Sequence, residues 1–252
     1  MVGRTIAAAA LLVAARGVAA RGLVVSPSAV FARAGETAER TLVLRPTSAG
    51  RTRVSIGVSA FAVDEDGRPS LTGRPGPRDA SALVAVSPGT VVLDGGPVEV
   101  TLRLGTPAGE GSVWAAVVMD VEPVELEASA GMPVEVVTRV VVPVVITPAN
   151  GREDVAIRAL EARRDASVVE VTALLVNDGS AVARAVADVA LEEGSEEAPV
   201  EIATRHVSGV LLFPGQSRRL VLRLDSSLPS AAAVRLLLTA GARRAESVAP
   251  LD

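Results

Sequence analysis

The chain has 252 residues, of which 49% are hydrophobic and 21% charged, and its formal net charge of −4 argues against a general binder of nucleic acid or of anionic membranes. This length predicts two domains, each able to bury a core without metal or disulfide staples. Because cysteine, lysine and tyrosine are absent and His206 is the only histidine, cysteine redox chemistry and thiolate zinc sites are excluded, and we expect a protein that is not an enzyme and uses no cofactor and no metal.

Residues 1–20 have the features of a secretory signal peptide. A basic residue, Arg4, precedes an apolar run over 6–15, and small residues follow at 18–20, where a signal peptidase can cut. The run is too short for a membrane span, which needs about 20 residues. The alternative is an ordinary amphipathic first helix, because alanine-rich runs favour helix. We expect export to the periplasm, the medium or the cell surface, with no membrane span in the mature chain.

From residue 23 onward, short runs of valine, leucine and isoleucine are separated by clusters of glycine, proline, serine and aspartate. Several runs alternate apolar and polar residues, which is typical of antiparallel strands with one buried face. In the first half, strands are predicted near 23–26, 29–32, 38–45, 52–63, 83–86, 98–104, 112–121 and 134–147. Pro148 and Gly151 then end the last run, so a first domain is predicted over 21–148 and a linker over 149–153.

The second half, 154–252, has the same rhythm and is predicted to be a second domain. Its strands are expected near 155–161, 167–176, 182–191, 200–206, 210–212, 218–224 and 232–239. Two β-sandwiches account for the spacing of strands and turns better than a closed barrel or βαβ units do. The predicted fold class is therefore all-β, with two consecutive immunoglobulin-like β-sandwich domains after a signal peptide.

Three segments outside the predicted strands are candidate sites. Residues 68–82 contain three prolines and no periodicity, so they are predicted to form a long irregular loop, a kind of segment that often carries function. The acidic segments 64–67 and 192–197 suit hairpin tips better than cation sites, since 64–67 lacks the ligand spacing of a calcium loop. His206 lies near Ser208, but no Gly-x-Ser-x-Gly elbow occurs and a single histidine at a strand end is usually structural.

The strand at 134–147 is the most informative segment. Its even-numbered residues can supply a core, which leaves Val137, Val141 and Val145 in need of another cover. Pro143 cannot donate a ladder hydrogen bond, so this is predicted to be an edge strand or one that switches sheets. A long apolar edge strand can accept a strand from another chain. Cover by the N-terminal strand or by the second domain is the alternative.

The first half resembles the N-terminal domain of periplasmic pilus-assembly chaperones of the PapD type. The similarity lies in the pattern of segments and covers about residues 23–148, whereas 154–240 look only generically like a second immunoglobulin-like domain. The matching segments are 25–31 with 34–37 and 42–44, 54–61 with the acidic turn 64–67, and 87–93, 98–104 and 111–117.

In that family the last strand of the first domain pairs with a pilus subunit and supplies the strand that the subunit lacks. The resemblance assigns this role to residues 134–146, and it makes Arg139 similar to a cation that holds the subunit's terminal carboxylate, which a guanidinium can bind through two hydrogen bonds. The predicted partner-binding residues are Arg139, Val137, Val141, Val145, Val140 and Val142.

The resemblance implies an exported chaperone or assembly factor that captures an extended segment of a protein partner, such as a fibre or pilus subunit, by β-strand augmentation. A second possibility is a structural or adhesive module of the cell envelope. Such a module would bind another surface protein or a glycan through loops such as 68–82.

Overall fold

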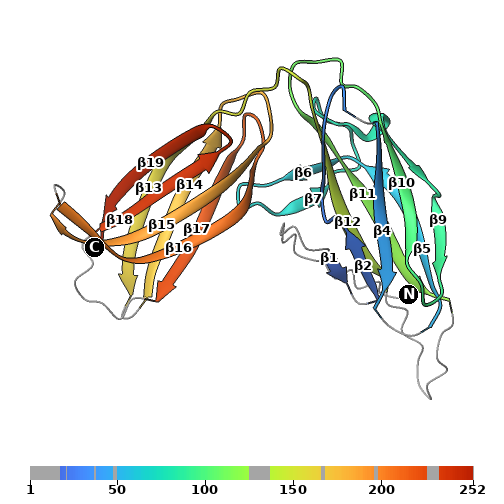
Figure 1. Cartoon of the computed structure of the whole chain (residues 1–252), viewed down its shortest axis with the longest axis horizontal. Coiled ribbons are helices and arrows are strands. Elements are labelled where there is room, and N and C mark those ends of the chain that lie inside the picture. Colours follow the sequence, from blue (N-terminus) through green and yellow to red (C-terminus); the bar gives the residue numbers. More distant parts are fainter. Residues whose placement is uncertain are drawn as a thin grey trace. The chain divides into compact units, whose positions relative to one another are not determined.

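The computed structural model describes residues 18–20, 22–36, 38–47, 50–124, 137–165, 168–195, 198–225 and 233–251. The chain divides into two compact units, Met1–Ala62 with Pro69–Ala149 and Val63–Arg68 with Asn150–Asp252. Within the described ranges both consist of strands, and the only helical element is a short 3-10 turn, η1 (Ser81–Leu83) (Figure 1). The all-β fold class predicted from the sequence is confirmed.

Most of the predicted signal peptide, residues 1–17, lies outside the described residues. Its last three residues form a strand, β1 (Val18–Ala20), that pairs antiparallel with the first predicted strand, β2 (Leu23–Ser26). No helix in the described part of the chain has the length and apolarity needed to cross a membrane.

The first unit contains two five-stranded sheets. The first sheet has the order β1-β2-β4-β10-β8, where the later strands are β4 (Glu39–Pro46), β10 (Val98–Leu104) and β8 (Val84–Ser87). The second has the order β3-β12-β11-β5-β9, formed by β3 (Val30–Arg33), β12 (Thr138–Thr147), β11 (Val113–Pro123), β5 (Thr52–Ser59) and β9 (Thr90–Leu93). Two short strands, β6 (Phe61–Val63) and β7 (Pro69–Leu71), pair separately.

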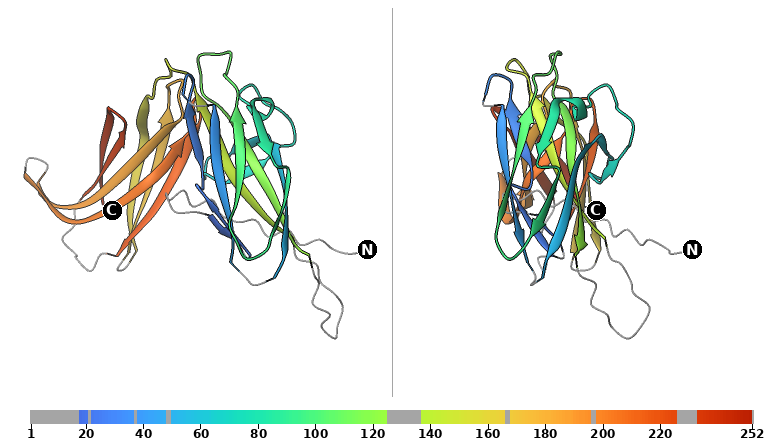
Figure 2. Two further views of the ribbon diagram at one scale, coloured as in Figure 1. Left: turned by 45° about the vertical axis from the view of Figure 1, so that its right-hand side comes forward. Right: turned by 90° about the vertical axis from the view of Figure 1, so that its right-hand side faces the viewer.

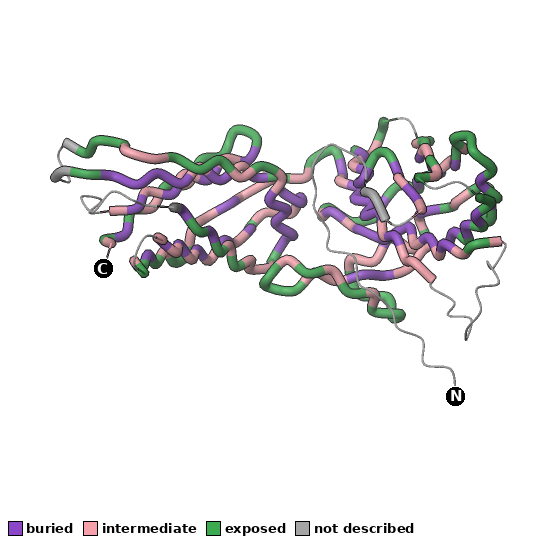
Figure 3. Tube along the Cα trace, turned by 90° about the horizontal axis from the view of Figure 1, so that it is seen from below, coloured by how far each residue is buried: buried purple, intermediate pink, exposed green. Residues whose placement is uncertain are grey.

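The core of the first unit lies between these two sheets because their strands alternate in polarity. In β5, Val54 and Ile56 are buried while Arg53 and Ser55 are exposed, and Figure 3 colours the chain by burial. The neighbouring strands β11 and β12 instead contain continuous buried runs. One continuous cluster joins leucines of β2, β4 and β10 to valines of β11 and β12. The two sheets therefore form a β-sandwich.

The second unit is a smaller sandwich of a three-stranded and a four-stranded sheet. The three-stranded sheet has the order β13-β14-β17, formed by β13 (Val155–Asp165), β14 (Val168–Asn177) and β17 (Ser217–Asp225). The four-stranded sheet has the order β16-β15-β18-β19, formed by β16 (Ala198–Leu212), β15 (Ala183–Ser195), β18 (Ala233–Ala240) and β19 (Arg243–Pro250). The hairpin of β15 and β16 runs on beyond its neighbour β18 (Figure 2).

Two differences from the predicted strands have clear causes. The predicted strands 200–206 and 210–212 are one strand, β16, because the interruption between them is a bulge and not a turn. Gly209 has a φ of +74° at this bulge, a conformation that glycine adopts without steric cost. The loop predicted over 68–82 also contains β7 and the first two residues of η1, because regular structure in a proline-rich segment without periodicity leaves no local pattern in the sequence.

Candidate functional site

The strand β12 is closed on one side and half open on the other. On one side β11 pairs with it antiparallel over its whole length except the last residue. On the other side β3 pairs with it in parallel, but only over Val144–Thr147. Among the residues that the structure describes, no strand pairs with the outer side of Thr138–Pro143. The N-terminal strand therefore covers the second half of β12, and the first half is a sheet edge.

The backbone groups that face the open edge belong to the odd-numbered residues of β12. The N–H of Ala34 donates to the carbonyl of Thr147 over 2.8 Å, so Thr147 turns its backbone groups toward the β3 side. Backbone groups alternate in direction along a strand, and the register of β12 with β11 has no shift. Arg139, Val141 and Pro143 therefore face the same side. Proline is tolerated at 143 because the N–H that it lacks would point to the open edge and not into the β11 ladder.

Three of the predicted partner-binding side chains are buried within the chain itself. Val140 and Val142 point into the sandwich core and have no exposed surface. Val145 is 1% exposed on the opposite face of β12, where its cross-strand neighbours are Trp114 of β11 and Phe31 of β3. An added strand can therefore reach neither the side chains of these residues nor the backbone groups of Val140 and Val142, which face β11.

The other three predicted residues lie together on the outer face of the sheet. Val137 precedes β12 directly, and Val137, Arg139 and Val141 are all of intermediate exposure. Alternate residues of a strand share a face, so the guanidinium of Arg139 stands between two half-buried valines. This trio borders the open edge and is the part of the predicted site that remains accessible.

Arg139 has a partner in the protein that sequence reasoning missed. It lies opposite Asp120 of β11, and its Nε and Nη2 donate to the two carboxylate oxygens over 2.7 and 3.0 Å. The side chains of Arg139 and Asp120 are 39% and 33% exposed. The hydrogen bonds from Arg139 to Asp120 raise the pKa of the guanidinium above its ordinary value, although burial opposes the shift. A single acid within the apolar run 113–121 was the available signal in the sequence.

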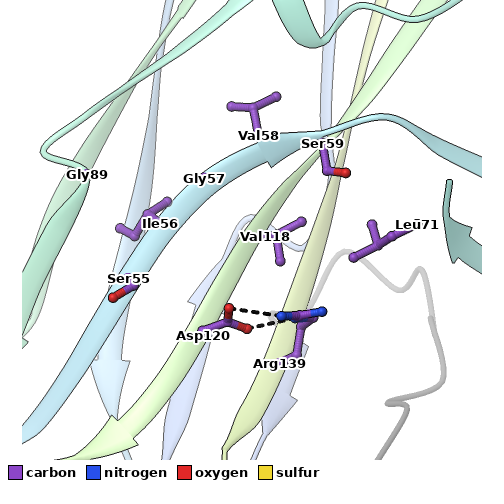
Figure 4. A pocket seen from close by; sticks show the side chains of 10 residues that line it. All are labelled: Ser55, Ile56, Gly57, Val58, Ser59, Leu71, Gly89, Val118, Asp120 and Arg139. Atoms are coloured by element: carbon purple, nitrogen blue, oxygen red, sulfur yellow. Dashed lines mark hydrogen bonds and ion pairs between the residues drawn. The ribbon is translucent and has the colours of Figure 1, made fainter. Parts of the chain in front are cut away.

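An open groove of about 400 Å³ lies beside this ion pair. Its floor is β5, where Ser55, Gly57 and Ser59 carry small side chains or none, and Val118 of β11 and Leu71 of β7 border it (Figure 4). A Cβ built on Gly57 meets nothing within 4 Å, so the space above this residue is empty. Of the described residues that line the groove, Asp120 and Arg139 are the charged ones.

The remaining candidates from the sequence have simple structural roles. His206 of β16 contacts Asp188 of β15 through Nδ1 over 2.7 Å, on the exposed surface of the second unit. The acidic segment 64–67 is a turn in which the N–H of Gly67 donates to the carbonyl of Asp64 over 2.9 Å. Residues 196–197 of the other acidic segment lie outside the described residues. Across the described ranges there is no group of three residues that could hold a metal ion.

No protein-family model and no curated protein sequence matches the chain. Its structure is similar to solved structures of fimbrial chaperones at low sequence identity. The class 5 fimbriae chaperone CfaA is 12% identical, with 91% of this chain and 99% of that chain covered and a TM-score of 0.47.

Two further solved structures are similar to this chain at comparably low sequence identity. A chain from the Salmonella enterica complex of SafA pilin with the SafB chaperone is 13% identical, with 93% and 99% covered and a TM-score of 0.48. The Pseudomonas aeruginosa CupB2 chaperone is 15% identical, with 90% and 100% covered and a TM-score of 0.41. Similarity at this level of identity concerns the fold alone.

Proposed function

We propose that this protein is an exported, non-enzymatic chaperone or assembly factor that adds an extended segment of a partner protein to the open edge of β12. The observation that supports this most strongly is the direction of the backbone groups of Arg139 and Val141, which face a side where no described strand pairs. Such a row of N–H and C=O groups is a template for a further strand.

The side chains around this edge suit a transient partner. Val137 and Val141 are half-buried and offer apolar contacts to an added strand. Arg139 and Pro143 interrupt the edge, and a charge and a proline are devices by which proteins keep an edge strand from pairing without selectivity. The open stretch is also short, because β3 occupies the edge from Val144 onward.

The sequence resemblance to pilus-assembly chaperones suggests the class of partner. A fibre or pilus subunit that lacks a strand would present an extended, alternating apolar segment. A periplasmic location would bring the two together.

The experiment is to compare partner capture from the envelope of the source cell by two variants at one position. Val141→Pro removes the N–H that faces the open edge and leaves the β11 ladder intact, whereas Val141→Thr keeps that N–H and has nearly the same volume. We expect wild type and Val141→Thr to capture a small β-rich protein and Val141→Pro to lose it. Equal capture by Val141→Pro, with its fold checked by circular dichroism, would contradict the proposal.

A further inference from the structure

We infer that the open edge of β12 selects an extended segment with an acidic residue opposite Arg139 and apolar residues two positions to either side. This inference rests on the proposed function and specifies the chemistry of its partner. It concerns a side chain within the captured segment and not a chain terminus. It follows from what lies on the two flanks of Arg139.

Among the described residues, Asp120 of β11 lies on one flank of Arg139, and no strand pairs with β12 on the other flank. A guanidinium has five N–H donors in a planar fork, and Asp120 accepts from two of them, through Nε and Nη2. Three donors remain. The side chain is 39% exposed, and it lies beside a groove in whose described lining Asp120 and Arg139 are the charged residues. Arg139 can therefore bind a second carboxylate without releasing the first.

A strand added at the open edge would place a side chain at the required position. Residues directly opposite on neighbouring strands have Cβ atoms about 4.5–5.5 Å apart on the same face. Asp120 holds this position on the β11 side of Arg139. The residue opposite Arg139 on the added strand would hold the equivalent position on the other side, and an acid there would leave Arg139 between two carboxylates.

The neighbours of Arg139 define the rest of the pattern. Val137 and Val141 lie two residues before and after it on the same face, and both are half-buried. The residues opposite them would be two positions from the acid in the added strand. Apolar side chains at these positions would cover the exposed parts of the valines. The preferred segment is therefore apolar-x-acid-x-apolar.

The opposite preference applies to a basic residue. A lysine opposite Arg139 would set two like charges side by side, which destabilises a cross-strand pair. Asp120 cannot neutralise both cations, because it carries a single negative charge and already pairs with Arg139. Discrimination between acid and base at one position is thus the signature of this site.

The test uses the full chain and three blocked peptides, acetylated and amidated so that no terminal charge contributes. Their sequence is Ser-Val-Thr-Asp-Thr-Val-Ser, with the central residue kept as Asp or replaced by Asn or Lys. Binding is followed by NMR through the amide signals of Arg139 and Val141. We expect the Asp peptide to bind most tightly and the Lys peptide about tenfold more weakly, as expected for exchanging a favourable for an unfavourable cross-strand charge pair.

The control is the double variant Arg139→Gln with Asp120→Asn, which removes both charges and keeps the valines and the open backbone. It should bind all three peptides equally. Retained preference for Asp in this variant, or equal binding of the three peptides by wild type, would overturn the inference and leave the proposed function standing. If no peptide moves the signals of Arg139 and Val141, the proposed function itself is wrong, and this inference fails with it.

Discussion

Asp120 and Arg139 lie directly opposite each other on β11 and β12, and two parallel hydrogen bonds join the carboxylate to the guanidinium. This is the fork geometry in which arginine binds a carboxylate most strongly. Because about a third of each side chain is exposed, water competes for both charges and the pair adds little to stability. Its main effect is to hold a charged group at a fixed place beside the open edge.

The first prediction concerns the energy of this pair. Asp120→Asn should lower the free energy of unfolding by less than about 1 kcal/mol, because exposed ion pairs contribute in this range. Glu39→Gln is the matched control, since Glu39 of β4 pairs with Arg103 of β10 over 2.9 Å with more of both side chains exposed. Denaturant titrations at low and high salt would measure both. A loss above about 3 kcal/mol, the size found when a buried ion pair is broken, would show that Asp120 is a structural residue of the sandwich.

A second prediction compares two glycines with opposite surroundings. An alanine at Gly57 places its Cβ in empty space above β5, so Gly57→Ala should be neutral or stabilise by up to about 1 kcal/mol through a less flexible unfolded chain. At Gly179 the same Cβ would lie 2.2 Å from the carbonyl oxygen of Arg152 and 2.7 Å from the backbone nitrogen of Asp154. Gly179→Ala should therefore destabilise by about 2 kcal/mol or more. Thermal unfolding of both variants measures the contrast, and similar melting temperatures would contradict it.

The third prediction is that Pro143 limits pairing of other strands with the open edge of β12. Pro143→Val supplies an N–H that points to the open side of β12, next to the backbone groups of Arg139 and Val141. The variant should self-associate more than the wild type in sedimentation experiments, with little change in the free energy of unfolding. Adding Val141→Pro should reverse the effect. A variant that stays as monomeric as the wild type would show that Pro143 does not limit pairing at this edge.

Local sequence patterns were sufficient to find most strands and the fold class. The alternation in 98–104 and in 52–59 matches β10 and β5 because each has one face in the core. Local sequence patterns gave the wrong strand boundaries where one residue type occurs in two kinds of backbone structure. Gly209 marks a bulge within β16, although glycine between apolar runs usually marks a turn.

The candidate site was only half predictable, for a physical reason. The sequence indicated an accessible strand with Arg139, Val137 and Val141 on one face. Cover by the N-terminal strand was the alternative that the sequence left open, and it could not be decided because the pairing of β3 with β12 joins segments more than 100 residues apart. The sequence also could not identify Asp120 as the partner of Arg139, because this contact depends on β11 and β12 becoming neighbours in the sheet.

The last prediction concerns two arginines that close the second sandwich. β16 and β17 are end strands of its two sheets. Arg205 of β16 donates to the backbone carbonyl of Arg223 on β17, and Arg218 of β17 donates to the carbonyl of Leu211 on β16 over 3.0 Å. Burial lowers the pKa of Arg218 below its ordinary value, which shows that its position there costs desolvation energy. Each arginine thus occupies an acceptor on the edge of the opposite sheet.

The double variant Arg205→Met with Arg218→Met keeps most of the apolar part of each side chain. It should leave the carbonyls of Arg223 and Leu211 without these donors, so that the edges of β16 and β17 become accessible to other strands. We expect faster amide hydrogen exchange in β16 and β17 and more self-association, because unpaired edges are templates for other strands. Arg223→Met is the matched control, since the side chain of Arg223 on β17 binds the exposed carboxylate of Glu170 on β14, within its own sheet, over 3.0 Å. It should leave exchange and association unchanged. Unchanged exchange in the double variant would contradict this prediction. It would mean that packing alone keeps β16 and β17 from pairing with other strands, without a contribution from Arg205 and Arg218.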